Sequence, residues 1–275
     1  MKYIKIIFCL FLIFISFYFT INSSIDELDL ASIYNINTKK IIKNIFLSVG
    51  NDKTDNALKL LKSNDSNDIV INTMDTKSTN KKIEVYLYNT HNKEEYKTNV
   101  YGITPSVVDV SNMIQSELLK YYVYSYVEKM DVVGEMKKRN LEYYDTYDIS
   151  RSNIISIRKK YPSINYIFDI HRDSVTGDLS RVKINDKSYA KIMFLVGKKN
   201  SNYKENEKNI KVMSDYINKK YPGILRNNYY NHYIFNQDIV PNAFLIEVGG
   251  PDNTIEELHN TSQVLAEAIN HLIGG

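Results

Sequence analysis

The chain has one cysteine, no tryptophan and almost no net charge, and each shortage is informative. Cys9 is the only cysteine among the 275 residues, so no disulfide can form within the chain. The net charge of +3 argues against a protein dedicated to binding nucleic acid. Tryptophan is absent while lysine, asparagine, isoleucine and tyrosine are abundant, which we interpret as genomic base composition and not as function.

The first residues have the pattern of a secretion signal. Lys2 and Lys5 precede an uncharged apolar run over residues 6–21. The run is somewhat shorter than the roughly 20 residues of a full membrane span, but bulky residues follow it where a signal peptidase needs small ones. We therefore predict an uncleaved membrane anchor over residues 1–24, with the rest of the chain on the extracytoplasmic side.

The remainder divides into a polar stretch and a region of alternating elements. Residues 25–80 are largely polar and rich in turn formers, which predicts a spacer or stalk. In residues 81–275, short apolar runs alternate with longer amphipathic ones, which predicts one α/β domain. Its sheet should be twisted and mainly parallel, with helices on both faces.

The boundaries of these elements follow from the hydrophobic pattern. We expect strands at 83–91, 164–171, 190–197 and 242–250, and amphipathic, helix-like segments at 107–130, 149–161, 202–221 and 253–275. Two apolar stripes at helical spacing support the first and last helices. The first stripe is Val107, Val110, Ile114, Leu118 and Tyr122, and the second is Ile255, Leu258, Leu265, Ile269 and Leu272.

Three of the expected strands carry polar groups near their carboxyl ends. His91 ends the first strand, His171 ends the second, and Glu247 lies within the otherwise apolar run "FLIEVGG". In a parallel sheet the carboxyl ends of the strands meet at one edge, where functional groups gather. An unpaired buried carboxylate would cost several kcal/mol, so Glu247 needs a partner.

A divalent metal ion supplies that partner. Two imidazoles and one carboxylate make a three-ligand zinc site that leaves a fourth position open. We therefore predict that His91, Glu94 and His171 bind Zn²⁺, with Glu94 three residues after His91 on the same short loop and Glu95 as the rival ligand. Glu247 is then the catalytic residue, which takes a proton from the attacking water and passes it to the leaving nitrogen.

The segments around these residues resemble the stage II sporulation protein P family, from about residue 83 to residue 273. The resemblance rests on "YNTHNKEEY", "YDTYDISRS", "IFDIHRDSV", "KIMFLVG", "NYKENEKNIKVMSDYINKKYPGI", "FNQDIVPNAFLIEVGGPDNTIEE" and the last helix. The family's Thr-His-x-x-Glu-x-Tyr motif corresponds to Thr90, His91, Glu94 and Tyr96, which favours Glu94 over Glu95 as the ligand.

The resemblance implies a membrane-anchored zinc N-acetylmuramoyl-L-alanine amidase with an additional endopeptidase activity on crosslinked stem peptides. It implies peptidoglycan as the substrate, and the sporulation protein D transglycosylase and the membrane protein M as partners. The setting would be the intermembrane space of the sporulating cell during forespore engulfment. This chain has only a short spacer upstream of the domain, so contacts that the family makes there are in question.

Amide hydrolysis also needs a donor near the developing oxyanion. Arg172, Arg151 and Asn236 are the candidates to contact the substrate or to support the residues that do, although Arg172 could instead pair with Asp173 or Asp169 and hold the loop. Two alternative functions stay open. A zinc carboxypeptidase acting on cell-wall peptides uses a similar ligand set with an arginine for the terminal carboxylate. A membrane-tethered wall-binding module would keep the fold without turnover.

Overall fold

A computed structural model describes residues 82–99 and 102–275. The predicted anchor at 1–24 and the predicted spacer at 25–80 lie outside the described residues. Within the described part of the chain, no helix has the length and apolar character needed to cross a membrane.

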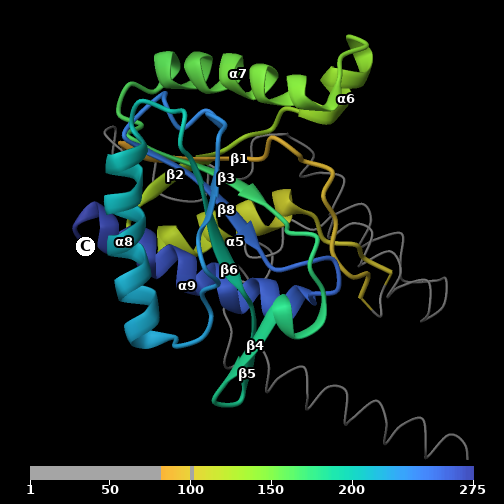
Figure 1. Cartoon of the computed structure of the whole chain (residues 1–275), viewed down its shortest axis with the longest axis vertical. Helices are drawn as coiled ribbons and strands as arrows, with labels where there is room; N and C mark the ends of the chain where they lie inside the picture. The colour runs from red at the N-terminus through yellow and green to blue at the C-terminus, as the bar shows by residue number, and fades with distance from the viewer. Residues whose placement is uncertain (1–81, 100–101) are drawn as a thin grey trace, which may run out of the picture. The chain divides into compact units, whose positions relative to one another are not determined.

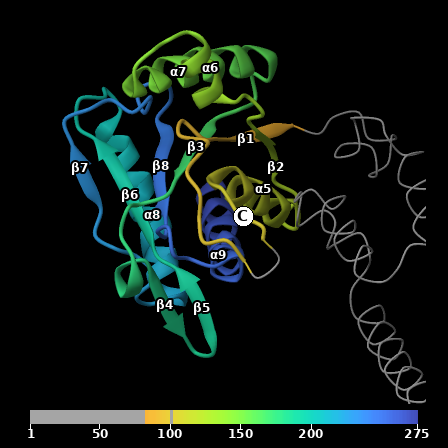
Figure 2. The ribbon, with the colours of Figure 1, turned by 90° about the vertical axis from the view of Figure 1, so that its right-hand side faces the viewer.

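The described residues form a six-stranded sheet in the order β2-β1-β3-β8-β6-β7, as Figure 2 shows. The strands are β1 (Ile83–Tyr88), β2 (Tyr124–Val127), β3 (Tyr166–His171), β6 (Ile192–Gly197), β7 (Tyr229–Asn231) and β8 (Asn242–Val248). Strand β1 pairs in parallel with β2 and β3, and β3 pairs in parallel with β8. Strand β6 is antiparallel to β8 and parallel to β7. The prediction of a mainly parallel sheet is confirmed.

Helices cover both faces of this sheet, as predicted. The helices are α5 (Val107–Leu119), α6 (Val132–Lys138), α7 (Thr146–Lys160), α8 (Tyr203–Lys220) and α9 (Ile255–Ile273), with 3-10 turns η1 (Tyr143–Asp145) and η2 (Gly177–Leu179). The larger core lies between one face and α5, α8 and α9. A smaller core packs α7 against the other face, on the side where Figure 1 shows α6 and α7. A short antiparallel pair, β4 (Arg181–Ile184) and β5 (Lys187–Ala190), is inserted between β3 and β6.

Alternation along the strands decides which side chains reach the site. Val85 and Leu87 of β1 belong to the larger core, whereas Tyr86 and Tyr88 belong to the smaller one. Because successive side chains of a strand point to opposite faces, the same alternation on β3 and β8 directs Asp169, His171 and Glu247 to the α7 face. Their neighbours, such as Phe168 and Phe244, enter the larger core.

The expected helical segment at 107–130 is wrong in its second half. Helix α5 ends at Leu119, and Tyr124–Val127 is the edge strand β2. Tyr122 has a left-handed backbone with φ of 59° and is 81% exposed, so it does not belong to the apolar stripe of α5. The cluster of aromatic and β-branched residues after the helix favours a strand. By contrast, the stripe on α9 is confirmed, because Leu258, Leu265 and Ile269 are fully buried.

Candidate active site

Three side chains at the ends of two neighbouring strands form a possible metal-binding cluster. His91 and Glu94 lie on the turn that follows β1, and His171 is the last residue of β3. Each offers one ligand atom, and these atoms lie within 4.8 Å of one another. The rings of the two histidines are 4.9 Å apart and nearly perpendicular. Glu95 is exposed and takes no part in the cluster.

Glu94 holds the cluster together. Its Oε1 lies 3.4 Å from His91 Nδ1 and its Oε2 lies 3.6 Å from His171 Nδ1. Its Oε2 also accepts a 2.8 Å hydrogen bond from the backbone N–H of Arg172. Burial by itself would raise the pKa of Glu94, but the two histidines and this backbone donor outweigh it and lower the pKa to about 2. Glu94 is therefore a carboxylate at neutral pH, which is the form that binds a cation.

Asp169 ties the His91 turn to the His171 strand. It is fully buried and accepts hydrogen bonds from the backbone N–H of Thr90 at 2.9 Å and from the Thr90 hydroxyl at 2.6 Å. Its Oδ1 also lies 3.0 Å from His171 Nε2. This distance allows a strong electrostatic attraction, although the two groups are poorly aligned for a hydrogen bond. Burial acts to lower the pKa of His171, yet Asp169 and Glu94 together raise it well above its usual value. Asp169 thus anchors Thr90, the residue before the candidate ligand His91, and faces the ring of the candidate ligand His171.

Glu247 lies beside the cluster on the neighbouring strand. It is the register partner of His171 in the parallel β3–β8 pair, so both side chains share the α7 face. Its Oε2 is buried and has no hydrogen-bond partner among the described residues. Burial is the main reason that the pKa of Glu247 rises to about 7, with His171 opposing the rise and Glu94 adding to it. A carboxyl group with this pKa can both take and give a proton near neutral pH.

Aromatic rings border the two histidines. The Tyr143 ring stacks on His91 with centroids 4.3 Å apart, and the Tyr147 ring meets the edge of His91 at 5.6 Å and faces His171 at 6.5 Å. Burial raises the pKa of Tyr143 to about 12 and that of Tyr147 further. Both phenols are therefore neutral at physiological pH and can donate a hydrogen bond.

The donor set fits a zinc ion. Two imidazoles and one carboxylate are the ligands that zinc takes in sites with an open position. Nε2 of His91 is buried without a hydrogen-bond partner among the described residues, and His171 points Nδ1 toward Glu94 and Nε2 toward the Asp169 carboxylate. A carboxylate behind a histidine ligand is a recurrent feature of zinc sites.

The three residues predicted to assist the substrate lie in different surroundings. Arg172 follows His171, and its Nε is buried with no hydrogen-bond partner in the described part of the chain. Arg151 forms a two-bond ion pair with Asp238, both bonds 2.8 Å long, and also donates to Asn236 Oδ1 at 3.3 Å. Asn236 is 5% exposed and donates to the backbone carbonyl of Tyr147 at 2.9 Å. Their role toward a substrate stays a prediction.

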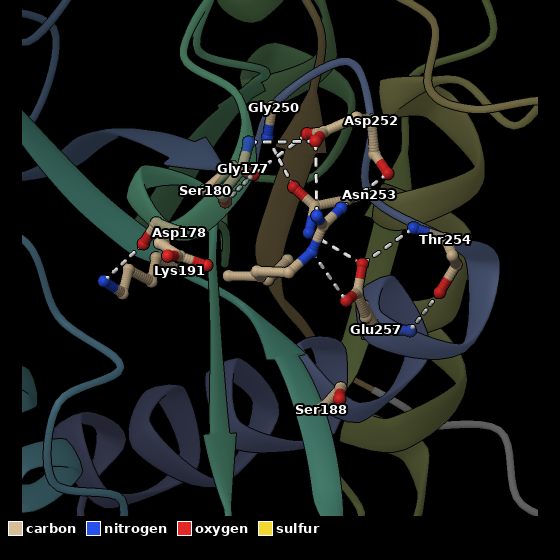
Figure 3. A network of polar contacts seen from close by, with 12 residues as sticks. Gly177, Asp178, Ser180, Ser188, Lys191, Gly250, Asp252, Asn253, Thr254 and Glu257 are labelled. Atoms are coloured by element: carbon tan, nitrogen blue, oxygen red, sulfur yellow. Dashed lines mark hydrogen bonds and ion pairs between the residues drawn. The ribbon is translucent and has the colours of Figure 1, made fainter.

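A polar network fixes the loops that follow His171 and Glu247, as Figure 3 shows. The Asp252 carboxylate accepts from the Gly177 backbone N–H at 2.9 Å and from the Ser180 hydroxyl at 3.0 Å. Arg181 donates to the Asp252 backbone carbonyl at 2.7 Å and to Glu257 Oε1 at 3.0 Å. The two loops are therefore joined to each other and to the start of α9.

From the sequence, Tyr143 and Tyr147 were not placed beside the histidines, Thr90 was named only as part of the family motif, and Asp169 was named only as a possible partner of Arg172. A signal for Asp169 existed, because it is a lone acid in the apolar run "YIFDIH", as Glu247 is in its own strand. Tyr147 lies in the motif "YDTYDISRS", but no local pattern indicates that the start of α7 contacts both histidines. His91 also differs slightly from expectation, since β1 ends at Tyr88 and His91 lies in the turn beyond it.

Several solved structures resemble the chain weakly. AmiC2, an N-acetylmuramoyl-L-alanine amidase of Nostoc punctiforme, matches 71% of this chain and 97% of its own with a TM-score of 0.42 and 12% identity. Ami1 from Mycobacterium smegmatis matches 70% and 97%, with a TM-score of 0.44 and 14% identity. The CwlD amidase from Clostridioides difficile, solved with the GerS lipoprotein, matches 69% of this chain and 96% of its own, with a TM-score of 0.41 and 14% identity. At this level of similarity the comparison carries no conclusion about the chemistry of the site.

Sequence comparison is more specific. The family model of Stage II sporulation protein P matches residues 17–270. Stage II sporulation protein P of Bacillus subtilis (strain 168) is 32% identical over 209 residues, which are 71% of this chain and 52% of that protein. The chain thus spans about half the length of the curated relative that it matches. Because the family model matches most of the sequence, including every residue of the candidate site, the chain belongs to the stage II sporulation protein P family.

Proposed function

We propose that the chain is a zinc-dependent peptidoglycan hydrolase that cleaves the amide bond between N-acetylmuramic acid and L-alanine. The observation that carries this proposal is the cluster of His91, Glu94 and His171, whose ligand atoms lie within 4.8 Å of one another beside Glu247. Membership of the sporulation family supports the substrate and the setting. Cleavage of crosslinks between stem peptides is part of the same proposal.

In this proposal His91, Glu94 and His171 hold the zinc ion. When bound, zinc polarises the scissile carbonyl and makes an attacking water acidic near neutral pH. The Asp169 carboxylate lies 3.0 Å from the His171 ring nitrogen Nε2 and, through its hydrogen bonds to Thr90, holds the turn that presents His91. These contacts preorganise the ligands on the ends of strands, where position is well defined.

The proton transfers are assigned to Glu247. Its Oε2 has no hydrogen-bond partner within the described residues, so it is free to accept the proton of the attacking water. The same carboxyl group then returns a proton to the leaving nitrogen, and general acid–base help of this kind is worth about 10²–10⁴ in rate. Arg172, which follows His171 and has a buried Nε without a hydrogen-bond partner among the described residues, is the candidate to stabilise charge on the carbonyl oxygen.

A carboxypeptidase is the competing enzyme activity. It needs a cation that is free to bind a terminal carboxylate, and the Arg151 guanidinium is already paired with Asp238 at 2.8 Å. Arg172 is then the remaining candidate, so the position of the cleaved bond decides between the two activities. A non-catalytic wall-binding module makes a different prediction, because His91→Ala and Glu247→Gln would leave its biological activity intact.

The cellular setting is proposed from the family. The chain would act during forespore engulfment with the sporulation protein D transglycosylase and the membrane protein M. It would be held in the membrane by residues 1–24 and face the intermembrane space. Fractionation of sporulating cells, followed by protease protection, tests this location.

The activity is tested by incubating the purified full chain with peptidoglycan, with and without a chelator, and identifying the products by mass spectrometry. We expect free stem peptides and peptide-free glycan in the presence of zinc, and neither product after chelation. Release of single terminal residues with peptides still attached to muramic acid would support the carboxypeptidase. Peptidoglycan left intact with zinc present would contradict both enzymes.

A further inference from the structure

A path of aromatic rings leads away from the candidate zinc ligands. The Tyr147 ring, which contacts His91 and His171, lies 5.6 Å from the ring of Phe235. The Phe235 ring lies 5.5 Å from that of Tyr233. Tyr233 is 54% exposed, so the path begins at the site and ends on the surface.

The edge strand β7 adds a fourth ring on the same face of the sheet. Tyr229 is the register partner of Leu195, and Leu195 in turn pairs with Leu245 of β8. Leu245 and Glu247 are two residues apart on one strand, so Tyr229 shares the face on which Glu247 lies. Tyr229 is 51% exposed. We call Tyr147, Phe235, Tyr233 and Tyr229 the aromatic path.

The backbone beneath the path is held in an unusual conformation. Phe235 and Asn236 both have left-handed backbones, with φ of 53° and 56°, which is uncommon for a bulky residue and carries strain. Buried polar contacts maintain it. Gln237 is 1% exposed, donates to the Leu195 carbonyl at 2.7 Å and accepts from the Gly197 N–H at 2.8 Å. Together with the Asn236 bond to Tyr147, these contacts fix the Phe235 ring against Tyr147.

The segment that carries three of the four rings has no acidic or strongly basic residue of its own, although Lys198 lies over the ring of Tyr230 and Arg151 pairs with Asp238 beside Asn236. Residues 227–237, "NNYYNHYIFNQ", contain no lysine, arginine, aspartate or glutamate. Stem peptides carry free carboxylates and call for cations, whereas pyranose rings are uncharged, and the lactyl carboxyl group of a muramic acid that bears a peptide is bound in the amide. The rings have apolar C–H faces that stack on aromatic rings and hydroxyls that bond to phenols. Tyrosine suits such a surface, because it offers a large rigid face and a polar tip at low entropic cost.

We propose that the aromatic path is a saccharide-binding subsite, which receives sugar rings of the glycan strand beyond the muramic acid whose amide is cut. This inference rests on the proposed amidase function and names the part of the substrate that lies along β7 and the 232–236 segment. It also gives Arg151 and Asn236 a role, since they hold Tyr147 and the Phe235 segment together.

The test measures binding of peptide-free glycan strands to the full chain by calorimetry, without reference to hydrolysis. Tyr233→Ala should weaken this binding about fivefold, the effect of losing one aromatic contact. Tyr122→Asn is the matched control. It removes a tyrosine that is 81% exposed after α5, and asparagine tolerates its left-handed backbone. Tyr229→Ala provides a second variant if the circular dichroism of Tyr233→Ala differs from that of the wild type.

Equal glycan affinity in the wild type and in both path variants would overturn the inference, as would the absence of glycan binding by the wild type. Weaker binding of sugar-free stem peptides, with glycan binding unchanged, would assign the path to the peptide and overturn it too. Loss of glycan binding in Tyr233→Ala, in a chain that cleaves no amide, would retain the subsite while refuting the proposed function. The two failures are therefore distinguishable.

Discussion

Replacing Asp169 by asparagine tests how the two candidate histidine ligands are held. The substitution keeps the shape of the side chain and an oxygen for the Thr90 N–H but removes the negative charge that lies 3.0 Å from His171 Nε2. Two unit charges at that distance attract each other by about 5.5 kcal/mol at an effective dielectric constant of 20, before the cost of burying them is subtracted. Carboxylates behind a metal ligand typically contribute 10- to 100-fold to metal affinity. We expect a loss of about 30-fold, or roughly 2 kcal/mol, for Asp169→Asn.

The assay is zinc competition with a chromophoric chelator, with thermal unfolding of each variant measured in parallel. Asp215→Asn is the control, because it removes the same charge at a surface position. Asp215 pairs with Lys211 on α8, and its side chain is 64% exposed. It should leave zinc affinity unchanged. Asp169→Ala should cost more than Asp169→Asn, since the buried N–H of Thr90 then loses its acceptor. Zinc affinity within twofold of the wild type in a folded Asp169→Asn variant would refute the reasoning.

Three further predictions follow from single contacts. Glu247→Gln should keep zinc affinity but lower the rate of amide cleavage by about 10²–10⁴; loss of zinc in a direct metal assay would instead make Glu247 a ligand. Gly250→Ala should lower the free energy of unfolding by about 3 kcal/mol or more, because a Cβ there would lie 1.7 Å from the Val175 carbonyl oxygen; an unchanged melting temperature would contradict this contact. The Arg151 guanidinium lowers the pKa of Asp238, so their pair stabilises the fold above the unfolded pKa of about 3.9 and stops doing so as the pH falls through the lower folded value. Between about pH 4 and pH 2, the free energy of unfolding should therefore fall less in Asp238→Asn than in the wild type. The difference should be under about 1 kcal/mol, because the pair is partly exposed. The same pH dependence of unfolding in both proteins would argue against the pair.

The order of strands could not be read from the chain. The apolar runs that became β1, β3, β6 and β8 were all recognisable, but the run ending at Gly197 gave no indication of its direction. In the structure β6 is antiparallel to β8, so its end lies at the opposite edge of the sheet from His171. The run ending at Gly197 carries no polar group at its end, unlike the runs with His171 and Glu247, and this agrees with the observed topology.

The local pattern was misleading where tertiary packing dominates. Residues 107–130 have apolar residues near helical spacing throughout, yet the chain turns at Tyr122 and adds β2 to the edge of the sheet beside β1. Pairing with β1 satisfies the backbone of Tyr124–Val127 and outweighs the helical pattern. Similarly, Tyr147 belongs to the site only because α7 begins over the two histidines.

Chemical identity and spacing were enough to predict His91, His171 and Glu247 as site residues, with Glu94 or its rival Glu95, because lone polar groups in or after apolar strands need partners and few arrangements provide them. Spacing also places Glu94 on the turn after His91. Which oxygen faces which ring, and the burial that moves the pKa of Glu94 down and that of Glu247 up, depend on distances between residues far apart in the chain. Such distances are fixed by the packing of the strands and of α7, and no local pattern encodes them.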